Sequence, residues 1–166
     1  IRDRYNVQHM DMNGNSELAV PQNTLGAELR QLENKQWEQI TLPHTPFVEP
    51  LTVLHQWQGI CYYKKKITIT PEEAKKHIWI EFEGAMHLAD VWINGKHVMQ
   101  HAGGYTPFVV DATGLLKTGK ENELLVRLDN RNNSLIPPGK PLETLDFCYY
   151  GGIYRNVHLI AKADVH

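Results

Sequence analysis

The chain has 166 residues, of which 42% are hydrophobic, and its 17 basic and 19 acidic side chains give a net charge of −2. This size fits one globular domain with a full core, at most with an extension. The charge balance argues against a nucleic-acid binder, which carries a basic excess, and no apolar run reaches the ~20 residues needed to cross a bilayer. We therefore expect neither nucleic acid nor a membrane span for this chain.

The beginning of the chain, residues 1–36, shows no clear hydrophobic period. The Asn-Gly-Asn-Ser run at 13–16 is a turn signal, and residues 25–32 fit one or two helical turns. We treat 1–36 as an N-terminal extension of uncertain structure and 37–166 as the folded domain.

From Trp37 onward, the sequence predicts strands separated by turns. One strand is expected at 37–42, where a proline follows, and a second at 59–70, which is rich in β-branched and aromatic residues. The polar stretch 71–76 begins with proline and fits a short helix.

The clearest strand pattern lies at 77–83, where apolar and polar side chains alternate. Its inward residues would be Ile78, Ile80 and Phe82. Further on, Asn94-Gly95 separates two strand-like runs at 88–93 and 96–101. This dipeptide predicts a two-residue hairpin, because a type I′ turn needs positive φ at both central positions.

The last third of the chain continues in the same way. Strands are expected at 108–110, 123–129 and 152–162, with a proline-rich loop at 130–145. The inward residues of the second of these strands would be Leu124, Val126 and Leu128. About seven or eight short strands with little helix predict an all-β fold, an antiparallel jelly-roll β-sandwich.

Catalytic and metal-binding constellations are missing. Ser16 and Ser134 are the only serines, and neither lies in a Gly-x-Ser-x-Gly elbow. The histidines and cysteines show neither His-Glu-x-x-His nor Cys-x-x-Cys spacing, so we expect no metal site and no cofactor. Cys61 and Cys148 are expected to be free buried thiols, with a disulfide as the alternative in an oxidising compartment.

The acidic residues do not form a catalytic pair either. Retaining glycoside hydrolysis needs two carboxylates about 5–5.5 Å apart. Glu81 and Glu83 share one strand face and are expected to point to solvent, and Asp111 and Asp129 fit turn caps. We therefore expect no catalytic residue in this chain.

One segment near the end of the sequence is typical of a carbohydrate site. Asp146 follows the proline-rich loop and precedes several aromatic residues, two glycines and a strand that carries Arg155. A carboxylate can accept two hydroxyl hydrogen bonds, and flat rings can cover the C–H faces of a sugar. We select Asp146, Tyr149 and Tyr150 as substrate-binding candidates, and Arg155 as either a carboxylate partner or a structural residue.

Several motifs occur in the order of one known family. They are Pro43-His44, Tyr62-Tyr63-Lys64-Lys65, Phe82-Glu83-Gly84-Ala85, Val91-Trp92-Ile93-Asn94-Gly95-Lys96, His101-Ala102-Gly103-Gly104-Tyr105-Thr106-Pro107-Phe108, Asp111-Ala112-Thr113, Gly119-Lys120-Glu121-Asn122 and Gly151-Gly152-Ile153-Tyr154-Arg155-Asn156-Val157. Together they resemble the N-terminal sugar-binding domain of glycoside hydrolase family 2, which includes β-galactosidases, β-glucuronidases and β-mannosidases. The resemblance covers residues 37–166 and implies a jelly-roll sugar-binding domain there.

The resemblance implies a function within a larger enzyme. In the family, this domain precedes an immunoglobulin-like domain and a (β/α)8 barrel, and the barrel carries both catalytic glutamates. The chain would then be a non-catalytic domain of a retaining β-glycosidase, with a β-linked sugar or oligosaccharide and those two domains as its partners. Asp146 matches an aspartate that reaches into the barrel pocket, contacts sugar hydroxyls and, in some galactosidases, helps to bind sodium.

Two other functions stay open from the sequence. A free-standing carbohydrate-binding module would use exposed aromatic residues such as Trp57, Tyr149 and Tyr150. A purely structural docking domain would bind no sugar and would carry an exposed apolar patch. The sequence leaves the sugar, the linkage and the oligomeric state open. Because the chain starts at Ile1 without a recognisable signal peptide, an exported and a cytoplasmic origin are both open.

Overall fold

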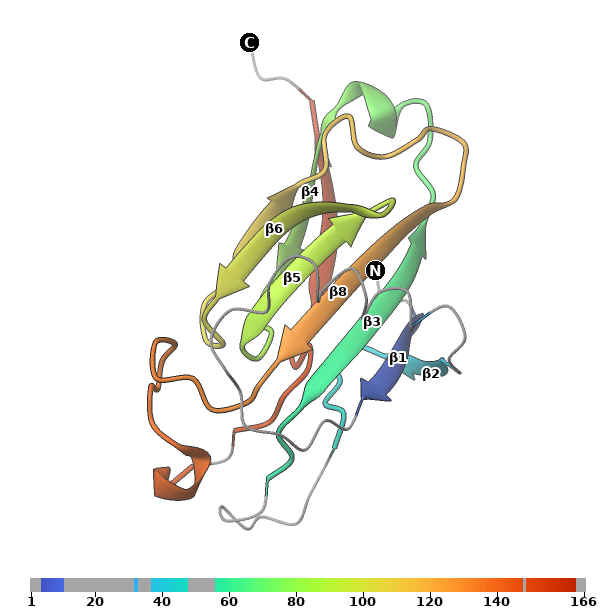
Figure 1. The fold of residues 1–166 in the computed structure, drawn as a ribbon. Coiled ribbons are helices and arrows are strands. Elements are labelled where there is room, and N and C mark those ends of the chain that lie inside the picture. Colours follow the sequence, from blue (N-terminus) through green and yellow to red (C-terminus); the bar gives the residue numbers. More distant parts are fainter. Residues whose placement is uncertain (1–3, 11–31, 33–36, 48–55, 148, 164–166) are drawn as a thin grey trace.

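The computed structural model describes residues 4–10, 32, 37–47, 56–147 and 149–163. In these residues two antiparallel β-sheets pack face to face as a sandwich (Figure 1). This arrangement confirms the predicted all-β fold. The short 3-10 helix η3 (Glu73–Lys75) lies within the predicted helix, and η4 (Leu142–Thr144) lies in the long loop after β8. Within the described part of the chain, no helix has the length and apolar character needed to cross a lipid bilayer.

The larger sheet has six strands and the smaller sheet has three. In spatial order, the larger sheet contains β2 (Glu38–Thr41), β1 (Arg4–Met10), β3 (Ile60–Ile67), β8 (Asn122–Asp129), β5 (Leu88–Ile93) and β6 (Lys96–Ala102). The smaller sheet contains β7 (Phe108–Asp111), β4 (His77–Phe82) and β9 (Val157–Lys162). Strands far apart in the sequence, such as β3 and β8, are direct neighbours. Pairing over long sequence distances therefore sets the fold.

The core lies between the two sheets. The residues that the alternation predicted to point inward are at most 2% exposed: Ile78, Ile80, Phe82, Leu124, Val126 and Leu128. They belong to one continuous apolar cluster with side chains from both sheets. Full burial of such a side chain contributes about 1.5–3 kcal/mol, so the alternating strands supply much of the folding free energy.

The predicted hairpin joins β5 and β6. Asn94 and Gly95 have φ values of 51° and 78°, as a type I′ turn requires. The Asn94 side chain donates to Asn122 Oδ1 at 2.9 Å and accepts from the Glu123 backbone N–H at 3.1 Å. The turn residue thus also ties the hairpin to the start of β8.

The sequence did not predict β1. This strand lies between β2 and β3, with Gln8 opposite Tyr62. It mixes polar and apolar residues without a sustained alternation, so its two ladders of backbone hydrogen bonds define it better than its own pattern does. The turn predicted at 13–16 and most of the helical turns predicted at 25–32 lie outside the described residues.

A second apolar cluster lies on the other face of the larger sheet. It contains Ile60 and Tyr62 from β3 together with Leu32, and Trp37 and Leu125 pack against it. Both faces of this sheet therefore carry buried side chains, which is why strand β3 shows a continuous run of buried residues at its start.

Candidate functional site

Loops at one end of the sandwich, the lower end in Figure 1, bring the candidate residues together. The long loop after β8, residues 130–147, carries Asp146, and residues 149–156 lead into β9. The connections at 83–87 and 103–107 meet the same end, because neighbouring antiparallel strands start and finish there.

Asp146 lies on the outer side of the long loop. Leu145, directly before it, is only 8% exposed, whereas Asp146 is exposed and Phe147 is 42% exposed. The loop therefore presents the carboxylate outward while its neighbour points into the protein. This placement suits a residue that contacts a ligand.

A small apolar cluster supports this part of the loop. It consists of Met86, Leu145 and Tyr149, with Tyr154 packed against it. The members come from the 83–87 connection, the long loop and the segment before β9, so the cluster joins pieces of chain that no strand ladder connects. We call it the loop cluster.

Tyr149, one of the three candidates, is 4% exposed and is held at both ends. Its hydroxyl forms a hydrogen bond with His87 Nδ1, and its backbone N–H donates to Gln56 Oε1. We call Gln56, His87 and Tyr149 the tyrosine clamp. Because the clamp holds Tyr149 beneath the surface, this tyrosine faces the protein interior three residues after Asp146.

His87 is neutral in this setting. Burial lowers the pKa of its imidazole to about 4, and the nearby charge of Asp129 only partly opposes that effect. A neutral imidazole has one donor and one acceptor nitrogen, so it can pair with a tyrosine hydroxyl in either direction. Burial also raises the pKa of the Tyr149 hydroxyl, which therefore stays protonated.

The remaining aromatic candidates are less exposed than a free sugar platform would require. Tyr150 is half-buried. Trp57 is also half-buried, packs against the main core and stacks with the exposed ring of Phe47 at 6.5 Å between ring centroids. Arg155 is exposed and lies over the ring of Tyr154, 5.9 Å from its centroid.

The glycine pair before β9 allows a close approach of three segments. Gly152 has φ of 97°, and a Cβ there would lie 2.5 Å from the Tyr63 hydroxyl and 2.7 Å from the carbonyl oxygen of His44. The Tyr63 hydroxyl also contacts His44 Nδ1 at 3.1 Å and accepts from the Ile153 N–H at 3.4 Å. Only glycine fits this position, and the motifs around Pro43, Tyr63 and Gly151 meet here.

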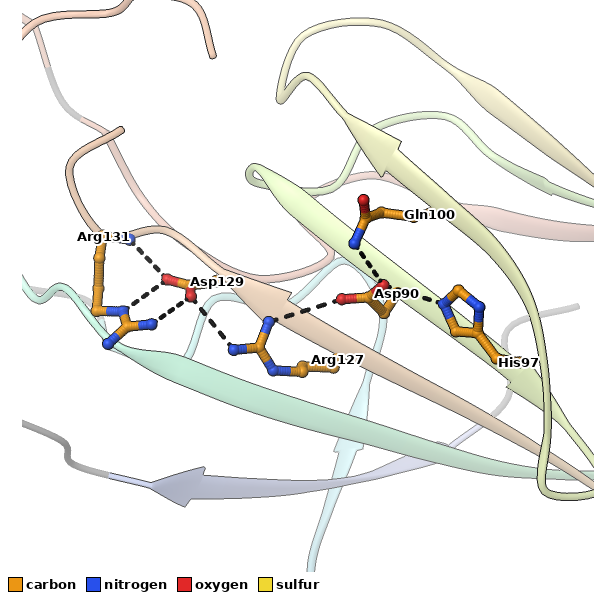
Figure 2. A network of polar contacts seen from close by, with 6 residues as sticks. All are labelled: Asp90, His97, Gln100, Arg127, Asp129 and Arg131. Atoms are coloured by element: carbon orange, nitrogen blue, oxygen red, sulfur yellow. Dashed lines mark hydrogen bonds and ion pairs between the residues drawn. The ribbon is translucent and has the colours of Figure 1, made fainter. Parts of the chain in front are cut away.

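A network of charged and polar side chains, buried at its centre and exposed at His97 and Gln100, runs across the larger sheet toward this end (Figure 2). Its members are Asp90, His97, Gln100, Arg127, Asp129 and Arg131, which we call the charged cluster. Arg127 is 1% exposed and lies between two carboxylates, 3.7 Å from Asp90 Oδ2 and 3.3 Å from Asp129 Oδ2. The arginine thus balances the charge of both strand neighbours.

The charged cluster reaches the first residues of the long loop. Arg131 donates from Nη2 to Asp129 Oδ2 at 2.7 Å and from its backbone N–H to Oδ1 at 3.1 Å. Burial raises the pKa of the Asp129 carboxyl, but the hydrogen bonds from Arg131 and the charges of Arg127 and Arg131 outweigh it, so the pKa is lowered. The predicted turn cap at Asp129 is confirmed, and the same carboxylate also anchors two arginines.

Asn130 fixes the next residue of the loop. Its side chain accepts from the Gly59 N–H at 2.8 Å and donates to the Trp57 carbonyl at 3.0 Å. A Cβ on Gly151 would lie 2.8 Å from Asn130 Nδ2. The buried amide therefore ties the start of the long loop to the segment before β3, and the absence of a side chain at Gly151 lets the segment before β9 pack closely against it.

The other acidic candidates have structural partners. Asp111 caps the Thr113 N–H at 2.9 Å, which confirms its predicted role. The Glu83 side chain is 38% exposed, so it points to solvent as predicted, and it also contacts His158 Nε2 at 2.8 Å and accepts from Asn156 Nδ2 at 3.1 Å. The hydrogen bond with His158 lowers the pKa of Glu83. Among the residues that the structure describes, no group of three or more histidines, cysteines and acids could hold a metal ion.

Sequence reasoning did not single out the clamp partners of Tyr149. Gln56 and His87 lie outside strands, and neither belongs to a recognisable motif. Arg127 of the charged cluster was also missed. Its strand alternates normally, and Arg127 occupies an outward-facing position in that alternation. Cys61 is a free, buried thiol whose pKa is raised by burial, and Cys148 lies outside the described residues.

Comparison with known proteins adds the family. The family model described as "Glycosyl hydrolases family 2, sugar binding domain" matches residues 7–163. A β-galactosidase of Thermoanaerobacter pseudethanolicus is 34% identical over 152 residues, which cover 90% of this chain and 20% of the relative. A β-glucuronidase of Bacteroides fragilis is 38% identical over 127 residues, which cover 73% of this chain and 17% of the relative. The chain thus spans a fifth or less of the length of these relatives.

Solved structures show the same architecture. The crystal structure of a β-glucuronidase from Bacteroides uniformis matches with a TM-score of 0.72 at 28% identity. The match covers 98% of this chain and 17% of the β-glucuronidase chain. A family 2 glycosyl hydrolase from Bacteroides cellulosilyticus has a TM-score of 0.70 at 25% identity, over 98% of this chain and 20% of its own. In both cases nearly the whole of this chain corresponds to a small part of a larger protein.

Proposed function

The chain belongs to glycosyl hydrolase family 2 as its sugar-binding domain, and from this we propose that it acts within a retaining β-glycosidase that hydrolyses O-glycosidic bonds. Retaining hydrolysis needs two carboxylates about 5–5.5 Å apart. Near the loop end of this chain, Glu83 and Asp129 are engaged by His158 and by arginines. We place the catalytic pair in another part of the polypeptide, since these two carboxylates have structural partners.

We assign Asp146 the role of a substrate contact. The observation that carries this role is the exposed carboxylate at 146 on a loop whose neighbour Leu145 is buried in the loop cluster. An ionised carboxylate accepts hydrogen bonds from two sugar hydroxyls, and such charge-assisted bonds are stronger than neutral ones. Tyr150, half-buried four positions later in the chain, would border the sugar, and the buried Tyr149 would support the site without touching the sugar.

The partners follow from the same loop. Two apolar side chains of the long loop are exposed: Leu135 is 73% exposed and Phe147, next to Asp146, is 42% exposed. Exposed apolar side chains beside a ligand residue suit an interface with another domain. We propose that the (β/α)8 barrel and the immunoglobulin-like domain of the same polypeptide lie against this end, and that the sugar is bound between Asp146 and the barrel.

A sodium ion beside Asp146 fits this chain only in part. Hard cations take several oxygen ligands, whereas the described residues hold no cluster of three acidic or histidine side chains. Asp146 would supply one oxygen, and the remaining ligands would come from the barrel.

The decisive experiment replaces Asp146 in the enzyme that carries this domain. Asp146→Ala should lower kcat/KM by about 100-fold or more, because the lost contact orients the sugar in the transition state. Glu143→Ala is the matched control, since Glu143 is an exposed acid on the same loop. Unchanged kinetics for Asp146→Ala would leave only a docking role for this domain.

A further inference from the structure

We propose that Tyr149 and His87 are positioning residues for Asp146: the tyrosine clamp holds the long loop so that the carboxylate at 146 is already in place when a sugar arrives. This inference rests on the proposed function of Asp146 as a sugar contact. It concerns how this site is built, and it gives a role to a buried histidine and a buried glutamine that the sugar contact itself does not explain.

Asp146 lies between two buried residues of the chain, Leu145 and Tyr149. Leu145 before it is 8% exposed within the loop cluster, and Tyr149 after it is 4% exposed. Because each residue spans at most about 3.6 Å, Asp146 lies directly beside Leu145 and within about 11 Å of Tyr149. The position of the carboxylate therefore depends on how firmly the two ends are fixed.

The end at Tyr149 is fixed by side chains from elsewhere. The hydroxyl pairs with His87 Nδ1 and the backbone N–H with Gln56 Oε1. The Gln56 Nε2 atom is buried and has no hydrogen-bond partner among the residues that the structure describes. A buried donor without a partner lowers stability. The side chain of Gln56 therefore contributes to stability through its oxygen, which accepts from the Tyr149 N–H.

Backbone hydrogen bonds on both sides hold His87 in turn. Its backbone N–H donates to the Asp129 carbonyl at 3.3 Å, and its carbonyl accepts from the Gly103 N–H at 2.9 Å. The imidazole is 2% exposed beside the loop cluster. The histidine therefore transmits the rigidity of the sheet, through Asp129 at the end of β8, to a loop that has no strand ladder of its own.

Such a device matters because ordering a loop residue costs conformational entropy. If this ordering occurred during substrate binding, it would weaken the interaction, and misplacement by about 1 Å can reduce a rate about 100-fold. A clamp formed during folding removes that cost from the catalytic cycle. Tyr149 and His87 then affect catalysis only through Asp146.

The test is a double-mutant cycle in the full enzyme. Tyr149→Phe should lower kcat/KM about tenfold in the wild-type background but less than about twofold in the Asp146→Ala background. His87→Leu breaks the same hydrogen bond from the other side and should add little to Tyr149→Phe. Tyr154→Phe is the control: it removes a hydroxyl whose hydrogen bond goes to the Gly104 carbonyl and not to Tyr149, and it should change kcat/KM less than about twofold.

Amide hydrogen exchange on this chain provides a readout that does not need activity. Tyr149→Phe should speed exchange in residues 142–149 about tenfold, while β3 and β8 stay protected. Equal effects of Tyr149→Phe with and without Asp146, or unchanged exchange in the loop, would overturn the clamp. If Asp146→Ala itself leaves kinetics unchanged, the proposed function fails, and the exchange experiment alone decides whether Tyr149 orders the loop.

Discussion

In the described part of the chain, the charged cluster and the tyrosine clamp are built in opposite ways. The charged cluster joins neighbouring strands of the larger sheet through Arg127, Asp90 and Asp129. The tyrosine clamp joins connections at the loop end, and its members carry no formal charge at neutral pH because the pKa of His87 is lowered to about 4. The charged cluster thus uses ion pairs between strands that backbone hydrogen bonds already join. The tyrosine clamp uses neutral hydrogen bonds between segments outside the strands.

This difference separates stability from positioning. Strands β5 and β8 are already paired along their length by backbone hydrogen bonds. The charged cluster therefore affects chiefly the free energy of unfolding of this sheet. The long loop has no comparable pairing, and its geometry depends on a few side chains. Damage to the charged cluster should therefore appear mainly in unfolding, and damage to the clamp mainly in activity.

The largest expected effect comes from removing the buried arginine. Arg127→Met should lower the free energy of unfolding by about 3–5 kcal/mol, because it leaves two buried carboxylates without their shared counter-charge. Urea denaturation of this chain measures the change. Arg127→Lys keeps the charge but loses the planar fork, and it should recover part of the loss. A change in Arg127→Met of less than about 1 kcal/mol would contradict the assigned role of the cluster.

The second prediction concerns the pH dependence of the clamp. The pKa of His87 is about 4 in the folded chain and 6.5 in its ordinary state, so between these values the unfolded chain binds more protons. Stability should therefore fall as pH decreases from about 6.5 to about 4, by about 3 kcal/mol in total, and be insensitive to this group above that range.

Comparison with His87→Gln isolates this contribution. Denaturation curves of both proteins across pH 4–7 should converge toward the acid end, since only the parent chain loses the histidine-dependent stability. Asp129 has a lowered pKa, so its contribution disappears at lower pH, as the solution approaches and passes below its ordinary value of 3.8. Parallel curves for the two proteins would show that His87 is not buried in its neutral form.

A smaller effect on stability is expected from Tyr149→Phe. The substitution keeps the ring in the loop cluster and removes one buried hydrogen bond, so the free energy of unfolding should fall by about 1–2 kcal/mol. Thermal unfolding of this chain measures it. A loss as large as that of Arg127→Met would indicate that the clamp supports the whole fold, and the contrast between the two groups would disappear.

The smallest effect should come from the exposed margin of the charged cluster. Gln100 is exposed and donates to Asp90 Oδ1 at 2.9 Å, but the same carboxylate also has His97 at 3.0 Å and Arg127 as partners. Gln100→Ala should therefore cost no more than about 0.5 kcal/mol. A larger loss in chemical denaturation would mean that the outer edge of the cluster is as important as its centre.

Much of the fold could be predicted from local patterns. The alternation at 77–83 identified the inward residues of β4, and Asn94-Gly95 identified the hairpin. The pattern failed for β1, whose place depends on the strands on both sides of it. It gave the solvent-facing side of Glu83 but not its partner His158 on β9, which lies 75 positions away.

The candidate site divided in the same way. The segment around Asp146 could be recognised because a carboxylate next to aromatic residues and glycines is a local feature. Its place on an exposed loop is visible only in the structure, and so is the burial of Tyr149 against His87.

The sequence by itself determined the strand pattern, the hairpin turn, the resemblance to family 2 and the choice of Asp146, because these depend on residues close together in the chain. Only the tertiary structure decided which polar groups are buried together. Tyr149 meets His87 across 62 positions, and the backbone at Gly152 passes the Tyr63 hydroxyl in a space that fits only glycine. Such contacts arise from the order of strands in the two sheets, and no local period of side chains encodes that order.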